Sequence, residues 1–511
     1  MRWSKYHRFF CFLPVTPAWL LSGLLLLLPP VARGMSGQGF GDHSGLAGGK
    51  FNPSVMVMSR HFLEVKLLGG QLFFRNNMAF VPGSEYTHRG FWSNPGAALP
   101  QGRDQDEEKQ GRLVATRPKA NKYLHLNARI TGPSVLFVHG RHAFALSEGL
   151  RTASSASQLP YEVSFMILHG HPPYPDQSYQ HTEPFWLHSM SWLEWAASYA
   201  GLIVDRPGHQ LAAGLSVKFN QGIHGLFYKN SQVEYADRGG SALDIHSLTA
   251  DMGISLPLDY NTNSPFSPAG AIAGRGLSVD AGVTYSIPSN RFARERRRFT
   301  GQIRWGRASP CETPYVPYRF RFGVSLLDAG RIRYTKNIRY LIAEEASSTP
   351  GQSTHFHHAA NIGEFIDEIG IYFTGSTDSL RADRAFSMGL PSTLSLQIDY
   401  HAGSNIFVHA LGMGPVSLSQ NGPSGPAYLS LAPRFENRWF ELGLPLTLYR
   451  YREPLLGLSV RVWNLRLGTT SLRSLLAAGD FRGADFYISF SLGILKGNCP
   501  GVFGRPANCL E

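Results

Sequence analysis

Apolar and polar residues alternate one by one along several long stretches of this chain. The clearest stretch is 276–287, where the apolar residues fall on one side of an extended strand: Leu277, Val279, Ala281, Val283, Tyr285 and Ile287. The residues on the other side are small or polar: Gly276, Ser278, Asp280, Gly282, Thr284 and Ser286. At ~3.3 Å per residue, a strand of about twelve residues is longer than most globular strands and suits a tilted crossing of a membrane.

The same alternation returns at 211–220, 394–401, 440–449 and 486–494. A strand of a soluble sandwich also alternates, so the repetition of long amphipathic strands decides between the two folds. Within a membrane every backbone hydrogen bond must be made by the protein itself, which a closed sheet with an apolar outside achieves. The pattern predicts an all-β fold, a closed antiparallel transmembrane β-barrel of roughly 14–18 strands with long loops.

The order of segments predicts four parts. Residues 1–34 are a predicted signal peptide, because basic residues precede the apolar run 20–28 and small residues follow it. Residues 35–58 are rich in glycine and serine and are interpreted as a periplasmic lead-in or a plug inserted into the lumen. The barrel is predicted at 59–495, followed by a C-terminal tail at 496–511.

Two local patterns add detail. In the long interruption 344–392, Ile362, Phe365, Ile366 and Ile369 recur at helical spacing, which predicts a short amphipathic helix under the barrel mouth or inside it. The stretches 318–327 and 331–340 alternate on either side of Asp328-Ala329-Gly330, which predicts a hairpin. With the turn centred on Ala329, all the large apolar residues share one face and Arg319 lies across from Arg339.

Composition agrees with a barrel without deciding for one. Charged residues make up 16% of the 511 residues, aromatic residues 12%, and the formal net charge is +12. Cys499 and Cys509 lie in a short exported tail, where they form a disulfide in an oxidising periplasm or remain two free thiols.

Several short motifs resemble those of a family of outer-membrane β-barrels from Bacteroidetes, domain of unknown function 5723. They are Phe51-Asn52-Pro53, Leu390-Pro391-Ser392, Pro433-Arg434-Phe435, Leu444-Pro445-Leu446 and Gly483-Ala484-Asp485. The resemblance implies a barrel in the outer membrane of a Gram-negative bacterium. It implies no particular activity.

The candidate site is a basic wall of the lumen made by arginines on the predicted polar faces: Arg319, Arg321, Arg331, Arg333, Arg339 and Arg461. Rings of arginine are what anion-preferring pores use, so the wall favours anions. In the alternative interpretation, Glu64, Asp280 and Asp399 neutralise these arginines across a packed lumen. A second basic run, 291–298, is a site for lipopolysaccharide phosphates if its loop faces outward, and otherwise a solvated loop.

No motif for catalysis, metal or cofactor binding is recognised. The histidines at 355, 357 and 358 lack a completing cysteine or carboxylate, and no nucleophile-elbow, zinc-protease or phosphate-loop motif occurs. We therefore expect a channel or transporter, not an enzyme, for a small anionic or amphipathic solute. The alternative is a non-conducting barrel that scaffolds a surface, secretion or gliding assembly. Expected partners are outer-membrane lipid, lipopolysaccharide, the barrel-assembly machinery and an unidentified solute or secretion partner, but not nucleic acid.

Overall fold

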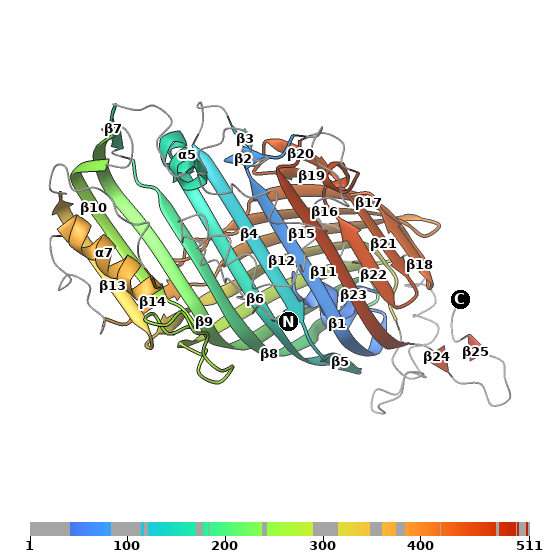
Figure 1. Cartoon of the computed structure of the whole chain (residues 1–511). Helices are drawn as coiled ribbons and strands as arrows, with labels where there is room; N and C mark the ends of the chain where they lie inside the picture. Colours follow the sequence, from blue (N-terminus) through green and yellow to red (C-terminus); the bar gives the residue numbers. More distant parts are fainter. Residues whose placement is uncertain are drawn as a thin grey trace, which may run out of the picture.

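The computed structural model describes residues 41–82, 114–116, 121–169, 177–181, 183–237, 243–289, 315–347, 360–374, 384–419, 421–476, 480–496, 498–499 and 507–508. They form a closed antiparallel barrel (Figure 1). Its wall has 14 strand positions. The predicted fold class is confirmed, at the low end of the predicted strand range.

The first five positions of the wall follow the chain from β1 to β9. Their strands are β1 (His61–Asn76), β4 (Lys122–Thr131) with β5 (Ser134–His139), β6 (His142–Leu159), β8 (Trp186–Arg206) and β9 (His209–Asp237). Each of the next two strand positions of the wall, after β9, is occupied by two strands that lie end to end. They are β10 (Leu243–Ser255) with β11 (Gly274–Pro288), and β12 (Tyr318–Tyr334) with β13 (Ile338–Ala346).

The C-terminal strands complete the circuit. They are β14 (Phe386–Gly389) with β15 (Thr393–Gly403), β16 (Ile406–Pro415), β17 (Tyr428–Glu436), β18 (Phe440–Gly443) with β19 (Leu446–Tyr449), β20 (Glu453–Leu456) with β21 (Leu458–Val462), β22 (Leu465–Thr469) and β23 (Gly483–Leu495). Strand β23 pairs with β1 from His61 to Arg75, which closes the barrel between the two ends of the chain (Figure 1).

The remaining elements are short. They are the helices α2 (Gly45–Gly49), α3 (Val55–Met58), α5 (Tyr161–His169), α7 (Ile362–Thr374) and α8 (Leu472–Leu475), and the strands β2 (Ala79–Phe80), β3 (Val114–Ala115), β7 (Ser178–His181), β24 (Asn498–Cys499) and β25 (Ala507–Asn508). None of the described helices is long and apolar enough to cross a membrane.

The exterior of the barrel is apolar, and much of the interior is polar. On β11, Leu277 and Val283 are 63% and 46% exposed, whereas Ser278, Asp280 and Thr284 on the other face are buried. Exposed apolar side chains recur on most wall strands, including Leu146, Trp195, Val217, Val324, Leu396, Leu431, Leu446 and Ile488. This inversion of the usual soluble pattern stabilises a barrel only in contact with lipid. The protein is therefore a transmembrane β-barrel, the class of structure that spans the outer membrane of Gram-negative bacteria.

Most connections at one rim of the barrel are shorter than those at the other. The exception is 289–317, which begins after Pro288 of β11 and ends before Tyr318 of β12 at the rim with the short turns. At this rim, β5 and β6 turn between His139 and His142, and β8 and β9 turn between Arg206 and His209. His61 and Leu495, the two ends of the barrel, pair at the same rim. Outer-membrane barrels have short periplasmic turns and longer outer loops, so we refer to this rim as the short-turn rim and expect it to face the periplasm.

The predicted hairpin at Ala329 is wrong. Strand β12 runs without interruption from Tyr318 to Tyr334 and pairs with β11 along its whole length. Asp328 adopts a positive φ of 55° and forms a β-bulge, where the register against β11 shifts between Val279 and Ala281. Because side chains alternate with a period of two, the extra residue exchanges the two faces of β12 above the bulge.

The predicted amphipathic helix is present as α7, but it lies neither in the lumen nor under the barrel mouth. Its buried Ile366 packs against Ile254, Leu256 and Tyr260. Ile254 lies on the face of β10 opposite to Gly253, which approaches the interior ring of Phe227. Helix α7 therefore covers the outer face of the wall near β10 and β13 (Figure 1).

Candidate functional site

Residues 41–58, the N-terminal segment, lie inside the barrel and bond to several wall strands. Asn52 is fully buried, and its Nδ2 donates to Gln397 Oε1 at 3.0 Å and to Thr284 Oγ1 at 3.2 Å. Its Oδ1 accepts hydrogen bonds from the backbone N–H and the hydroxyl of Ser54. One asparagine thus joins the segment to β11 and β15.

Further contacts hold the segment along its length. The carbonyl of Phe51 accepts a hydrogen bond from Gln397 Nε2 at 2.9 Å, and the N–H of Leu46 donates to Glu64 at 2.8 Å. Near the short-turn rim, Lys496 Nζ donates to the carbonyl of Val57 at 2.7 Å. The segment also lies very close to the wall at Gly214 of β9, where an added Cβ would lie 2.4 Å from the backbone nitrogen of Ser54.

A first group of buried charges, the central ion cluster, lies on the inner wall. Its members are Arg129, Arg151, Glu194, Lys218, Asp280 and Asp328. Arg151 donates two hydrogen bonds of 2.8 Å to the two carboxylate oxygens of Asp328, and Lys218 Nζ lies 2.7 Å from Asp328 Oδ1. Lys218 also pairs with Asp280 at 2.5 Å. With three cations and three carboxylates, the cluster is neutral.

A second group, the rim ion cluster, lies toward the short-turn rim. It contains Asp399, Arg434, Glu436, Glu441, Arg461 and Arg466. Arg434 bonds to Asp399 at 2.7 Å, and Glu441 pairs with Arg461 at 3.1 Å and with Arg466 at 3.2 Å. This cluster is also balanced, so neither group by itself gives the lumen a positive field.

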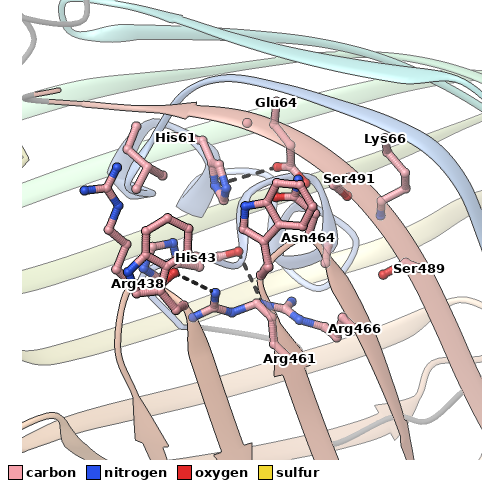
Figure 2. Close-up of a pocket in the computed structure, with 15 residues that line it drawn as sticks. His43, His61, Glu64, Lys66, Arg438, Arg461, Asn464, Arg466, Ser489 and Ser491 are labelled. Atoms are coloured by element: carbon pink, nitrogen blue, oxygen red, sulfur yellow. Dashed lines mark hydrogen bonds and ion pairs between the residues drawn. The ribbon is translucent and has the colours of Figure 1, made fainter. Parts of the chain in front are cut away.

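A cavity of about 160 Å³ lies between the N-terminal segment and the strands β1, β21, β22 and β23. Figure 2 shows His61, Glu64 and Lys66 on one side of it and Arg461 and Arg466 on the other. Two exposed tryptophans, Trp439 and Trp463, also line it.

Two cations of this cavity, Lys66 and Arg438, form no ion pair within the described ranges, and of these only Lys66 is buried, with 3% of its surface exposed. The carboxylate of Glu64 lines the same cavity and attracts the Lys66 ammonium, but it does not lie within ion-pair distance of it. His43 does not add charge, because burial, and secondarily the Arg461 guanidinium, hold the pKa of its imidazole well below the ordinary value. The cavity is therefore positive overall and can accept an anionic group at Lys66.

The arginines predicted to form one basic wall are separated in the structure. Arg321 and Arg461 are buried inside, where Arg321 donates to the carbonyl of Met58 at 3.2 Å. Arg319 is exposed at the short-turn rim. Arg331 and Arg333 are exposed on the outer face above the bulge, because the bulge exchanges the faces of β12.

The other predicted residues have different neighbours from those expected. Arg339 pairs in register with Ile254, and its guanidinium lies 5.3 Å from the centre of the Tyr260 ring, so it is not across from Arg319. Asp280 and Asp399 do neutralise arginine or lysine inside the lumen, but their partners are Lys218 and Arg434.

Three predicted features lie outside the residues that the structure describes. They are the signal peptide 1–34, the basic run 291–298 and the histidines at 355, 357 and 358. Cys499 ends β24, but Cys509 is also outside, so the disulfide stays a prediction.

Sequence reasoning did not single out Lys66, Glu194, Lys218 or Arg466 as site residues. The sequence contains a signal for them, because each is a charged residue at an inward position of a strand whose other residues are mostly apolar or small. Such residues are costly to bury and persist where they are paired or bind a ligand.

A model of a family described as a family of unknown function, DUF5723, matches residues 85–468 of this chain. The chain belongs to DUF5723. The Bacteroidetes origin that the resemblance implies stays a prediction. No curated protein is similar to this DUF5723 chain in sequence.

Solved structures similar to this DUF5723 barrel are outer-membrane proteins. The deltaS2 mutant of the TodX monoaromatic hydrocarbon channel has a TM-score of 0.39 and 10% identity, over 91% of this chain and 99% of that one. The toluene transporter TodX of Pseudomonas putida has a TM-score of 0.31 and 9% identity, over 90% and 96%. A FadL homologue of Pseudomonas aeruginosa has a TM-score of 0.28 and 10% identity, over 91% and 98%. At these identities the similarity concerns the barrel fold and not a solute.

Proposed function

We propose that this protein is a channel or transporter that moves a small anionic or amphipathic solute across the outer membrane. The observation that carries the proposal is the cavity beside the N-terminal segment, with Lys66 unpaired on its wall. An unpaired ammonium in a protein interior is unfavourable, and an anionic solute would relieve that cost.

The change of polarity along the lumen supports an amphipathic solute. Above the central ion cluster, the lumen holds an apolar lumen cluster: Met190, Trp192, Phe227, Ile332, Tyr334, Phe386 and Met388. These side chains are packed together and buried, and the Tyr334 hydroxyl donates to the carbonyl of His224 at 2.6 Å. A solute that entered between them would meet mainly ring and methyl groups. A solute with an apolar body and a charged end matches both regions.

In this proposal the N-terminal segment is the gate. Two kinds of contact anchor it, the hydrogen bonds to the wall and the packing of Met56, Val57 and Met58 in one buried apolar cluster with wall residues such as Leu136 and Val138. Opening must therefore exchange the hydrogen bonds for water and also break this apolar packing. The second candidate is a non-conducting scaffold. It is favoured by the balanced ion clusters and by the full burial of Asn52, both of which are features of a filled lumen.

Single-channel recording in planar bilayers separates the two candidates. We expect rare openings from the natural protein and a higher open probability from Asn52→Leu, which removes the hydrogen bonds to Thr284 and Gln397. Lys66→Met is expected to lower the preference for anions in a salt gradient. Lys336→Met, which removes an exposed lysine outside the lumen, is the matched control.

The two candidates predict opposite results in these recordings, and heat-modifiable migration on gels shows whether each variant is folded. If neither the natural protein nor Asn52→Leu conducts, while both keep the heat-modifiable migration of a folded barrel, the scaffold is favoured and the channel is refuted. If Lys66→Met and Lys336→Met have the same ion preference as the natural protein, the cavity is not part of the conduction path.

A further inference from the structure

Three arginines lie together on the outer face of the barrel, away from the lumen. Arg275 of β11 is directly opposite Arg333 of β12, and Arg331 is opposite the outward Leu277. All three are exposed. We refer to them as the outer arginine cluster.

The bulge at Asp328 is the reason that two of these arginines face outward. Below it, Phe322 and Val324 are the outward residues of β12, and above it the outward residues are Arg331 and Arg333. Ile332 and Tyr334 then face inward and are fully buried in the apolar lumen cluster. The inward carboxylate of Asp328, held by Arg151 and Lys218, fixes this arrangement.

The cluster lies at the upper edge of the apolar belt. The outward residues of β11 are apolar from Ile287, near the short-turn rim, to Leu277, and the next outward residue is Arg275. At ~3.3 Å per residue and a tilt of ~40°, this run rises ~25 Å, which is the height of the apolar band of such barrels. The arginines therefore lie level with the headgroups of the outer leaflet.

The charges of this cluster are not compensated by the protein. Among the described residues, no carboxylate lies within ion-pair distance of Arg275, Arg331 or Arg333. Two arginines directly opposite one another in an antiparallel pair repel unless an anion lies between them. Gln221 of β9 and Ser387 of β14, the partners in register of Arg275 and Arg333, flank the cluster with neutral hydrogen-bonding side chains.

We propose that the outer arginine cluster binds the phosphate of a lipid headgroup in the outer leaflet. Guanidinium groups form paired, charge-assisted hydrogen bonds with phosphate, and three of them can surround one phosphate group. The acyl chains of the same lipid lie along Leu277, Val217 and Phe219 directly below. Two lipids supply this chemistry, the phosphorylated glucosamine of lipid A and a glycerophospholipid.

The test measures binding of defined lipids to the purified full-length barrel in detergent by native mass spectrometry. The probes are lipid A, dephosphorylated lipid A and phosphatidylglycerol. We compare the natural protein with the triple variant Arg275→Gln, Arg331→Gln, Arg333→Gln and with Arg319→Gln. Arg319 is an exposed arginine of the same strand at the opposite rim, so it is the matched control.

We expect lipid A to bind the natural protein and Arg319→Gln equally, and the triple variant about tenfold or more weakly. Dephosphorylated lipid A should bind all three proteins weakly. Equal binding of phosphatidylglycerol and lipid A would support a phosphate site that accepts both sources. If the triple glutamine variant fails to fold, a triple lysine variant takes its place. Lysine keeps the positive charge but cannot form paired hydrogen bonds with phosphate, so this variant should bind lipid A with intermediate affinity. Undiminished lipid A binding by either triple variant overturns the proposal.

Discussion

A substitution of Asp328 tests two features of this structure together, the central ion cluster and the bulge of β12. Asn at this position keeps the shape of the side chain and tolerates the positive φ of 55°. Asp328→Asn therefore removes the charge and one of the two oxygens that accept hydrogen bonds from Arg151. The central ion cluster then has three cations and two carboxylates. One positive charge is left buried without compensation between Arg151 and Lys218.

The expected loss follows from the burial of the cluster. The side chains of Arg151, Lys218 and Asp328 are 1%, 7% and 7% exposed, so water cannot compensate for the missing carboxylate. Removing one partner from a buried pair typically costs about 3–5 kcal/mol of unfolding free energy. We expect Asp328→Asn to lose stability in this range.

A double variant separates charge balance from simple loss of contacts. Arg151→Met alone leaves one carboxylate in excess and should cost a similar amount. Combined with Asp328→Asn, it leaves Arg129 with Glu194 and Lys218 with Asp280, which are two complete pairs. The double variant should therefore cost less than the sum of the single variants.

Urea-induced unfolding in lipid vesicles, followed by tryptophan fluorescence and by heat-modifiable migration, measures these free energies. Arg319→Gln is the control for removal of an exposed charge and should change stability by less than about 1 kcal/mol. A loss below about 1 kcal/mol for Asp328→Asn, or strictly additive single variants, would refute the account of the cluster as a set of mutually dependent charges.

Three further changes have defined outcomes. Gly276→Val places a Cβ 2.0 Å from the carbonyl oxygen of Arg331, so β11 and β12 must separate above the bulge. We expect a poor yield of refolded barrel on gels, and a yield equal to that of the natural protein would contradict this close approach. Phe227→Ala removes a fully buried ring from the apolar lumen cluster and should lower the free energy of unfolding in vesicles by about 3–5 kcal/mol. A loss under about 1 kcal/mol would show that the cluster is loosely packed. Burial, with a smaller effect of Arg321, lowers the pKa of the Lys496 ammonium from 10.5 to about 7. The unfolded chain therefore binds this proton more tightly, and folding stability should rise with pH from about 7 toward 10.5 and fall as the pH drops to 7. Lys496→Met should flatten that rise in unfolding midpoints, and an unchanged slope would assign it to another group.

The outward and inward faces of most strands could be predicted from sequence because they depend on a local property. A strand in lipid needs apolar residues with a period of two, and this requirement is visible within ten residues of chain. Leu277 and Val283 face lipid, and Ser278 and Thr284 face the interior, as their alternation predicts.

The bulge could not be predicted in this way, because its cause is a contact between distant residues. Asp328 bonds to Arg151, which is 177 positions earlier in the chain. The sequence Asp-Ala-Gly is typical of a turn, and only the inner cations make it a continuous strand. The error then assigned Arg331 and Arg333 to the lumen.

The cavity was missed for a similar reason. It forms where the first barrel strand meets the last ones, so Lys66 and Arg466 become neighbours only when the barrel closes. No spacing within the sequence links two such residues. The excess of charged residues at inward positions was the available signal, but it does not indicate which of them remain unpaired.

The bulge also changes how related sequences should be aligned to this one. A gap of a single residue in a surface loop alters little, but a gap of one between Leu326 and Arg331 exchanges the membrane-facing and water-facing sides of the upper part of β12. A homologue that lacks both this residue and an equivalent of Arg151 would therefore have lipid-facing isoleucine and tyrosine where this protein has arginine. Alignments of this segment are best anchored on the aspartate.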